Sequence, residues 1–343
     1  MDNPEDIEMQ YERTGAPPEW DSELLGYGLV SPMQSSAFID LMKLRGFEPA
    51  YFYLRAGGET IGQVCVGLDR HGFAVWYYGP VVKAGRPLCY NAAFRLLIEE
   101  LRNEGAACIE NATTCARYHG GALGEPEKYF HIYNEIIDTP YIDLGRSSDE
   151  LFASFDRAVR KNIRKCDREG AKVEFGKSPG LLETYLEMLK YHRAELGFDM
   201  PPFYPDGTSV ELFDRPGTEM LVAVASVDDT PLAGLGYVRF GGLLIEIAVA
   251  QSPEFRDFGL PLHDLIKVRA MDYFRDRGAV VYDLMGAKKE PATEKESNIR
   301  RFKMKFTDRT ADIGIVERKV LSKVKFIGAK VGKKISSMLD GHR

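Results

Sequence analysis

The most constraining feature of the sequence is a pattern of elements that occurs twice. Residues Thr60–Glu110 and Leu221–Asp283 each contain strands joined by tight turns, then a helix, a glycine and a further strand. The ends of the two helices also correspond, with Leu101–Ala106 in the first half matching Phe274–Ala279 in the second. Repetition of one supersecondary pattern within 343 residues indicates two related domains in one chain.

We therefore predict an α/β (α+β) fold with two tandem domains, each a mixed, largely antiparallel sheet flanked by helices. In each domain a hairpin meander is followed by a helix that crosses over to a further strand. The first domain is placed at residues 1–145, the second at residues 146–316, and a basic C-terminal tail at residues 317–343.

The composition is that of a globular protein, with 44% apolar and 28% charged residues. No apolar run approaches the roughly 20 residues that a membrane span needs, and the acidic segment Met1–Asp6 does not resemble a secretory signal. The five cysteines form no C-x-x-C pair, and the six histidines lack metal-ligand spacing. We expect a reduced, cytoplasmic protein without a metal centre or a disulfide framework.

Charge is distributed unevenly along the chain. The net charge is −6, but residues Arg318–Arg343 contain eight Lys and Arg against one Asp, a net charge of +7. A second basic element is a helix over Asp156–Arg168, whose cations recur at three and four residues and so share one face: Arg157, Arg160, Lys161, Arg164, Lys165 and Arg168. That face is either a solvated helix surface or a contact for phosphate groups.

A strand, a turn and a basic segment form the candidate site in the second half. Residues Ala279–Leu284 are predicted to be a buried strand, after which Gly286 frees the backbone to turn. The basic segment alternates Phe302, Met304 and Phe306 with Lys303 and Lys305. A lysine held beside aromatic rings at a strand exit suits a developing negative charge. The alternative is an edge strand with its lysines pointing at water.

Two carboxylates at strands are further candidates. Glu246 lies within the otherwise apolar strand Leu243–Val249, and Glu110 ends the last strand of the first repeat. Glu246 is either a general base with a raised pKa or a side chain that faces solvent on an edge strand.

The loop Val249–Pro261 resembles the V-x-P-x-x-R-x-x-G-x-G/A signature of the GCN5-related N-acetyltransferases. In that signature, backbone N–H groups at a helix N-terminus bind the pyrophosphate of coenzyme A. Here the final Gly/Ala is replaced by Pro261, which has no N–H to donate. The resemblance therefore supports the fold more than it supports coenzyme A as the donor.

Over roughly Ser31–Val316 the chain resembles the Fem family of aminoacyl-tRNA-dependent peptidoglycan aminoacyltransferases, without the coiled-coil arm of some members. The matching segments are Gln34–Phe38 (Q-S-x-x-W, with Phe for Trp), Tyr78–Val82 (G-P-V), Val159–Gly170 (R-x-x-I-R-K-A-x-K-x-G), Tyr282–Gly286 (Y-D-F-x-G) and Arg301–Thr307 (F-K-x-x-F-G, with Thr for Gly).

The resemblance implies a reaction in which an amino acid passes from aminoacyl-tRNA to an amine of a peptidoglycan precursor or related peptide. This would be direct aminolysis in an inter-domain cleft, with the acceptor on the side of the first domain and the donor on the side of the second. No cofactor is implied, since aminoacyl-tRNA is a co-substrate that carries an activated ester. Lys303 would stabilise the oxyanion, with Phe302 packing beside the acceptor substrate or the tRNA end. Glu246, which stands where the family has an aromatic residue, is the third catalytic candidate.

The resemblance also implies binding residues, with some departures. Lys43 neighbours Met42, which takes the place of a lysine that binds precursor phosphates, and the other substrate-binding candidates are Glu110, Arg193, Tyr204, Tyr282 and Asp283. The nucleic-acid-binding candidates are Arg160, Lys161, Arg164 and Lys165.

The basic tail is interpreted in three ways: as a membrane-surface helix, as a tRNA contact or as a helix packed on the body, with peripheral membrane contact slightly favoured. Two rival functions remain. One is an acyl-CoA-dependent N-acyltransferase in envelope polysaccharide or peptide modification. The other is a non-enzymatic tRNA- or membrane-binding protein.

Overall fold

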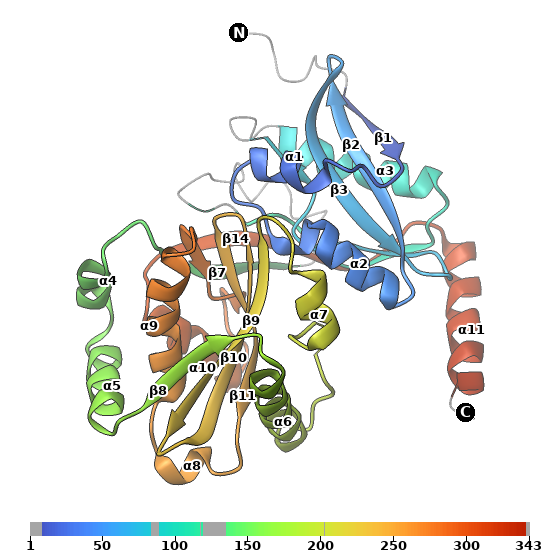
Figure 1. The fold of residues 1–343 in the computed structure, drawn as a ribbon. Coiled ribbons are helices and arrows are strands. Elements are labelled where there is room, and N and C mark those ends of the chain that lie inside the picture. The colour runs from blue at the N-terminus through green and yellow to red at the C-terminus, as the bar shows by residue number, and fades with distance from the viewer. Residues whose placement is uncertain (1–8, 84–88, 117, 119–134, 202, 341–343) are drawn as a thin grey trace. The chain divides into compact units, whose positions relative to one another are not determined.

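The computed structural model describes residues 9–83, 89–116, 118, 135–201 and 203–340 (Figure 1). The chain divides into two compact units. Unit 1 combines Met1–Asp138 with Ala311–Arg343, and unit 2 is Thr139–Thr310.

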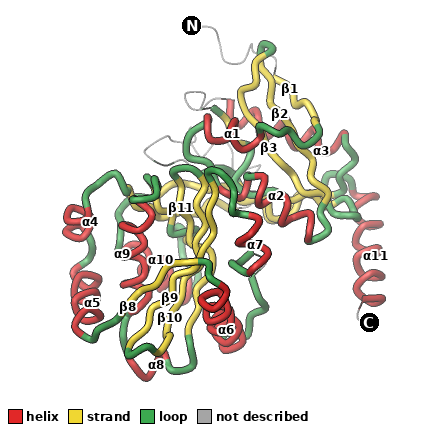
Figure 2. The backbone as a smooth tube through the Cα atoms, viewed as in Figure 1, coloured by secondary structure: helices red, strands yellow, loops and turns green. Residues whose placement is uncertain are grey.

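Unit 1 contains one mixed sheet in the order β1-β2-β3-β4-β6-β14, with the short β5 paired to β3. In Figure 2 its strands β1, β2 and β3 lie side by side. Its elements are β1 (Met9–Thr14), α1 (Trp20–Gly26), the 3₁₀ helix η2 (Pro32–Gln34), α2 (Ser36–Leu44), β2 (Glu48–Ala56), β3 (Glu59–Leu68), β4 (Phe73–Val75), β5 (Val81–Val82), α3 (Cys89–Asn103), β6 (Cys108–Thr113), β14 (Thr310–Val320) and α11 (Lys323–Asp340).

The core of unit 1 lies between α3 and the sheet. The helix contributes Phe94, Leu97 and Leu101 at helical spacing, and they pack against Phe52 of β2 and Ile109 of β6. All five side chains are fully buried, so the apolar face of α3 fixes its position over the strands.

Unit 2 contains a second mixed sheet in the order β7-β12-β11-β10-β9-β8, with the short β13 paired to β7. Its elements are β7 (Glu135–Asp143), α4 (Ser148–Ser154), α5 (Arg157–Arg168), β8 (Lys172–Gly176), α6 (Pro179–Glu195), α7 (Gly207–Leu212), β9 (Thr218–Val227), β10 (Thr230–Phe240), β11 (Leu243–Gln251), α8 (Phe255–Phe258), α9 (Leu262–Arg275), β12 (Val281–Asp283), β13 (Ala287–Lys288) and α10 (Glu294–Met304).

The predicted repeat is confirmed by the topology. In unit 1, α3 connects β4 to the parallel strand β6, and in unit 2, α9 connects β11 to the parallel strand β12. Both helices end alike, because Gly105 and Gly278 each have φ 87° and the next residue donates to the carbonyl five positions back, at 2.9 Å. Two tandem domains of mixed, largely antiparallel sheet are therefore present, as the sequence indicates.

The C-terminal segment departs from the predicted domain boundaries of 145/146 and 316/317. Strand β14 pairs antiparallel with β6, so that Val316 lies opposite Ala112 and is buried in the core of unit 1. Residues 317–320 are the end of β14, so the chain is back in the first unit before α11 begins at Lys323. Main-chain pairing with β6 explains the difference, because a strand that completes a distant sheet leaves no local signal of its partner.

Helices α6 and α9 lie on opposite faces of β9, β10 and β11 (Figure 1). On the sheet face toward α6, Gly234 of β10 has no side chain, and an added Cβ would lie 2.8 Å from Cδ2 of the buried Tyr185 ring. The missing side chain is what allows α6 to approach the strand closely.

We expect Gly234→Ala to lower the free energy of unfolding of unit 2 by about 1–3 kcal/mol, because the added methyl overpacks against a fixed ring. The matched control is Gly180→Ala in α6, where an added Cβ meets nothing within 4 Å. That variant should be unchanged or more stable by about 0.5–1 kcal/mol. Hydrogen exchange of β10 amides in the full chain measures both effects, and equal protection in the two variants would contradict the packing argument.

Candidate functional site

Two cavities in unit 2 meet at the same side chains. The larger has a volume of about 810 Å³ and the smaller about 300 Å³. Glu246, Val249 and Lys303 line both cavities. The larger cavity is completed by α9 and α10, and the smaller by α6 and the strand exit at Met285. A molecule in either cavity would therefore contact the same carboxylate and the same lysine.

An irregularity in β11 creates this opening. Tyr237 of β10 pairs with Glu246 but Gly236 pairs with Ala248, so Ile247 is an extra residue, a β-bulge. Beyond the bulge the strand becomes more exposed, and side chains of α6 bind its carbonyls: the Tyr185 hydroxyl donates to Ala248 O at 3.3 Å, and His192 Nδ1 lies 3.0 Å from Val249 O. A bulge of this kind re-aims side chains, and here it separates Glu246 from the exposed half of the strand.

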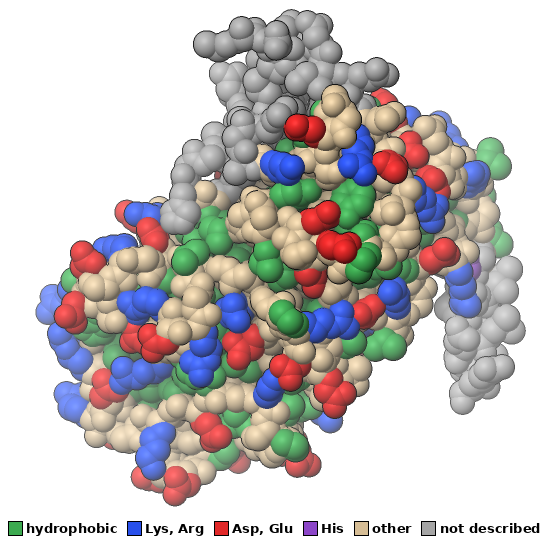
Figure 3. Space-filling model, turned by 45° about the horizontal axis from the view of Figure 1, so that its top comes forward, with side chains coloured by type: hydrophobic (Ala, Val, Ile, Leu, Met, Phe, Trp, Pro, Cys, Tyr) green, Lys and Arg blue, Asp and Glu red, His purple; other side chains and the backbone are tan. Residues whose placement is uncertain are grey.

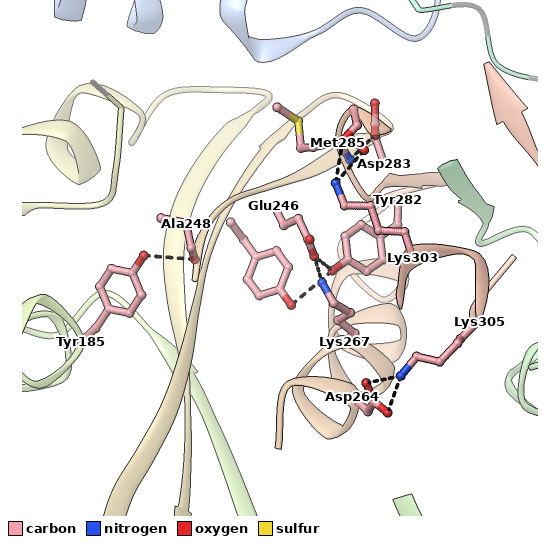
Figure 4. Close-up of polar contacts among 12 residues, drawn as sticks. Tyr185, Glu246, Ala248, Asp264, Lys267, Tyr282, Asp283, Met285, Lys303 and Lys305 are labelled. Atoms are coloured by element: carbon pink, nitrogen blue, oxygen red, sulfur yellow. Dashed lines mark hydrogen bonds and ion pairs between the residues drawn. The ribbon is translucent and has the colours of Figure 1, made fainter. Parts of the chain in front are cut away.

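Glu246 is buried in a cluster of polar groups (Figure 4). Its Oε2 accepts a short hydrogen bond from Lys267 Nζ of α9 and one of 2.6 Å from the hydroxyl of Tyr282 in β12. The alternative in which Glu246 faces solvent on an edge strand is wrong, because the side chain of Lys267 is only 2% exposed and that of Glu246 only 10%. Both donors stabilise the charged carboxylate.

The two bonds to Glu246 converge on one oxygen. Oε1 receives neither of them, and the residue lines both cavities, so this oxygen is the acceptor that a ligand can reach. The surrounding phenols stay protonated, because burial first and the nearby Glu246 charge second raise the pKa of Tyr237 and of Tyr282 well above the ordinary value.

Lys303 lies on a helix and not on an alternating strand, which corrects the edge-strand interpretation of residues 302–306. Helix α10 starts at a capping box in which Thr293 and Glu296 exchange hydrogen bonds, a signal that the T-x-x-E sequence carries. Lys303 Nζ donates to the carbonyls of Met285, at 2.9 Å, and Gly286, at 3.0 Å. Because an ammonium has three donors, one remains for the cavities that Lys303 lines.

The position of that lysine depends on the turn after β12. Asp283 Oδ1 accepts from the backbone N–H of Met285, at 2.6 Å, and from the hydroxyl of Thr139. Met285 takes a left-handed conformation, φ 66°, which presents the two carbonyls to Lys303. Burial lowers the pKa of Lys303, while the charges of Glu246 and Asp283 act in the opposite direction.

Phe302 lines the larger cavity beside these groups. Its ring lies 4.4 Å from Lys305 Nζ and 5.6 Å from Lys267 Nζ, with its edge toward Phe306. These cation–π contacts hold the ring in place as an apolar wall of the cavity.

The N-terminus of α9, where the GNAT signature places a pyrophosphate, already contains an acidic group. Asp264 in the first turn is 2% exposed. Its carboxylate accepts from Asn162 Nδ2 at 2.7 Å and pairs with Lys305 Nζ at 3.3 Å. Pro261 is the N-cap residue, and the N–H groups of Leu262 and Asp264 donate to nearby carbonyls. A second anion at this helix end would meet the negative charge of Asp264.

The other predicted binding residues lie in different places. In unit 1, Lys43 pairs with Asp40 at 2.9 Å, and Glu110 pairs with Arg318 across β6 and β14 at 2.8 Å. In unit 2, Arg193 lines the smaller cavity, where Nε donates to the carbonyl of Asp199 at 2.8 Å. Tyr204 is outside the lining of both cavities. The structure thus brings together Phe302, Lys303, Glu246, Arg193 and Tyr282, with Asp283 supporting the turn.

The predicted basic face is on α5. Its opposite side is buried through Val159, Ile163 and Cys166. Two of the cations bind nearby carbonyls: Lys165 Nζ donates to Gly259 O at 3.0 Å, and Arg160 donates to Ala153 O at 3.4 Å. Among the described residues, Lys161 and Arg164 form no ion pair, while Arg164 lies over the ring of Phe152. Elsewhere Lys and Arg are interspersed with Asp and Glu, as the visible face in Figure 3 shows.

Lys267 is a residue of the site that was not among the candidates from the sequence. It lies in α9 on the same face as the buried Met271, four residues later. A lysine at an apolar position of the helical repeat is the sequence signal that could have identified it. His263 is half-buried in that turn, and desolvation lowers the pKa of its imidazole to about 4. Within the described residues no cluster of metal-ligating side chains occurs, and no helix is long and apolar enough to cross a membrane.

Comparison with known proteins agrees with this fold. Residues 153–303 match the acetyltransferase (GNAT) domain family, and no curated protein matches the chain. FemX is similar at TM-score 0.68 and 16% identity, covering 90% of this chain and 96% of its own. A tandem GNAT protein from the clavulanic acid biosynthesis pathway is similar at TM-score 0.51 and 12% identity, covering 92% of this chain and 99% of its own. L-PGS from Bacillus licheniformis is similar at TM-score 0.51 and 9% identity, covering 88% of this chain and 98% of its own.

At these identities the solved structures show the fold, and they confirm the predicted Fem-like, tandem GNAT architecture. The family match over residues 153–303 lies within the second half of the chain and supports a GNAT-type acetyltransferase domain there.

The buried ion pair predicts a non-additive effect on stability. Lys267→Met leaves Glu246 charged without its cation, and we expect a loss of about 3–5 kcal/mol in the unfolding free energy of unit 2. The double variant with Glu246→Gln should lose clearly less, because no unpaired charge remains. Hydrogen exchange of β11 and β12 amides provides the measurement, and strictly additive losses would show that the two side chains are not coupled.

Proposed function

We propose that this protein is an aminoacyltransferase that moves an amino acid from aminoacyl-tRNA to an amine of a peptidoglycan precursor or related peptide. The observation that carries the proposal is the meeting of two cavities at Glu246 and Lys303. Direct transfer between two substrates requires that both reach the same reacting atoms, and two adjoining cavities satisfy that requirement.

In the reaction, the amine nitrogen attacks the ester carbonyl carbon. The new C–N bond forms as the C–O bond to the ribose breaks, and the amine loses a proton that the ribose hydroxyl finally carries. Because the ester is already activated, no covalent intermediate on the protein is needed. The protein must hold the two reactants in line and stabilise the tetrahedral oxyanion.

Lys303 is the proposed oxyanion partner. Two of its N–H groups are bound to the carbonyls of Met285 and Gly286, so its ammonium is fixed before substrate arrives. Preorganised donors of this kind are commonly worth about 3 kcal/mol in the transition state. Phe302 limits the movement of the bound carbonyl beside it.

Glu246 is the proposed acceptor for the attacking amine. Lys267 and Tyr282 bind Oε2, which fixes the orientation of the carboxylate and leaves Oε1 as the oxygen for the amine in the cavities that Glu246 lines. Glu246 accepts a hydrogen bond from the neutral acceptor amine, takes up the amine proton as the C–N bond forms, and passes that proton to the ribose oxygen as the C–O bond breaks. In this arrangement Lys267 and Tyr282 act as positioning residues.

The choice of donor rests on the N-terminus of α9. Its first turn contains the buried Asp264 bound to Asn162 and Lys305, and an N-cap proline, which together disfavour a pyrophosphate there. The rival donor, acyl-CoA, is favoured by the GNAT family match over residues 153–303. It remains the second candidate, with an N-acyl product in envelope polysaccharide or peptide modification.

The cations of α5, among them the exposed Lys161 and Arg164 and the half-buried Arg160, are the proposed tRNA contact within unit 2. They form one ridge that can neutralise several phosphates. We place the reaction in the cytoplasm, where charged tRNA and precursor are both made.

The donor test uses purified protein, a precursor mixture, and either aminoacyl-tRNA labelled in the amino acid or acetyl-CoA labelled in the acetyl group. We expect label to reach the precursor from aminoacyl-tRNA, and Lys303→Ala to reduce kcat about 100-fold or more while the protein stays folded. Mass spectrometry of the product gives the readout. Label arriving only from acetyl-CoA would reverse the choice of donor, and an undiminished rate in Lys303→Ala would remove that lysine from the reaction.

The pH dependence provides the matched control for Lys303. Its lowered pKa means that the cation is lost as pH rises through a value below that of an ordinary lysine, so kcat should fall on the alkaline side. Lys303→Arg keeps the charge at all these pH values and should remove the alkaline fall even where its rate is lower. An identical alkaline limb in both proteins would assign it to another group.

For the basic face, replacing Arg160, Lys161 and Arg164 by Ala should weaken tRNA binding. The slope of log K against log salt concentration should also become less negative by about two to three, because each cation that contacts a phosphate releases a counterion. The control replaces three other exposed lysines of unit 2, Lys172, Lys177 and Lys190, and should leave both quantities nearly unchanged. Equal behaviour of the two triple variants would reduce the α5 face to a solvated surface.

A further inference from the structure

Helix α11 (Lys323–Asp340) packs on unit 1 through one side of its described first part, residues 323–331. Phe326 and the buried Ala329 contact Phe73 and Cys108, and Lys325 Nζ donates to the carbonyl of Gly105 at 3.1 Å. The helix therefore has a defined inner face and a defined outer face over its described side chains.

The outer face is apolar. Val324, Ile327 and Val331 are 83%, 64% and 55% exposed, and their spacing of three and four residues places them in one stripe. Large aliphatic side chains gathered in this way on a water-exposed helix are unfavourable unless another surface covers them. The sequence continues the same spacing with Ile335 and Met338.

Lysines border the stripe. On a helical projection, Lys323 and Lys330 fall along one edge of it, and both are exposed. Lys330 Nζ lies over the Phe326 ring at 4.9 Å, and neither lysine forms an ion pair with a described acidic side chain. The segment Arg318–Arg343 has a net charge of +7 in a protein whose total is −6.

We propose that α11 is an interfacial anchor that holds unit 1 on an anionic lipid bilayer. The aliphatic stripe enters the boundary between headgroups and acyl chains, while the bordering lysines bind the lipid phosphates. Each feature selects the occupant: an RNA surface would use the cations but leave Val324 and Ile327 in water. A second copy of this helix would bring its lysines against like charges.

The position of the anchor has a consequence for substrates. A bilayer-bound enzyme meets acceptors that carry a lipid tail in two dimensions, which raises their local concentration. The inference does not depend on the donor, because membrane binding is measured without any reaction.

The experiment measures co-sedimentation of the full chain with phosphatidylcholine vesicles that do or do not contain phosphatidylglycerol. We expect binding to the anionic vesicles that weakens as salt is added. Binding to the neutral vesicles should be weaker by a factor of about ten or more. The variant with Val324→Ser, Ile327→Ser and Val331→Ser should lose binding to the anionic vesicles. Lys323→Gln with Lys330→Gln should weaken it and flatten the salt dependence.

The matched control is Leu44→Ser with Val280→Ser, which removes two other exposed aliphatic side chains, and it should bind vesicles like the wild type. Circular dichroism and light scattering of every variant test the fold and the oligomeric state. Wild-type protein that stays in the supernatant with anionic vesicles would overturn the proposal. So would serine variants that bind vesicles unchanged, or that lose a dimer or tRNA affinity instead of vesicle binding.

Discussion

The ion pair between Glu246 and Lys267 is the interaction on which the organisation of unit 2 depends. It joins β11 to α9, and Tyr282 adds β12, so all three parts of the crossover unit meet at one oxygen atom. A buried ion pair is a poor source of net stability, since two charges must leave water. Its cost is consistent with a functional role: the pair fixes one carboxylate oxygen and leaves the other at the cavities.

Lys303 is held by different means, although it lies close by. Its anchors are two main-chain carbonyls at the end of β12, which Asp283 positions by binding the N–H of Met285. Glu246 is therefore held by the side chains of Lys267 and Tyr282, whereas Lys303 is held by backbone carbonyls. A change in one support need not displace the other, and this allows a scaffold to keep its lysine while the acidic neighbour varies.

Much of the fold follows from local sequence patterns, and the repeat is the clearest case. The matching glycines Gly105 and Gly278 marked both helix ends, and the meanders around them were correctly placed. Local patterns did not predict the structure where a segment's conformation or burial depends on residues far away in the sequence. Phe302–Phe306 alternates like a strand, but the capping box at Thr293 extends a helix through Lys303. Glu246 gave no local sign of Lys267, and β14 gave none of β6.

The return of β14 to unit 1 affects the order in which the protein can be made. Strand β6 is bordered by β4 on one side and by β14 on the other, so its second edge stays unpaired until residues near Val320 have left the ribosome. Unit 2 is contiguous and can fold during synthesis, whereas the unit that contains the start of the chain is completed last. The pairing of β14 with β6 therefore lets unit 2 fold before the sheet of unit 1 is complete, the reverse of the usual order of domain folding during synthesis.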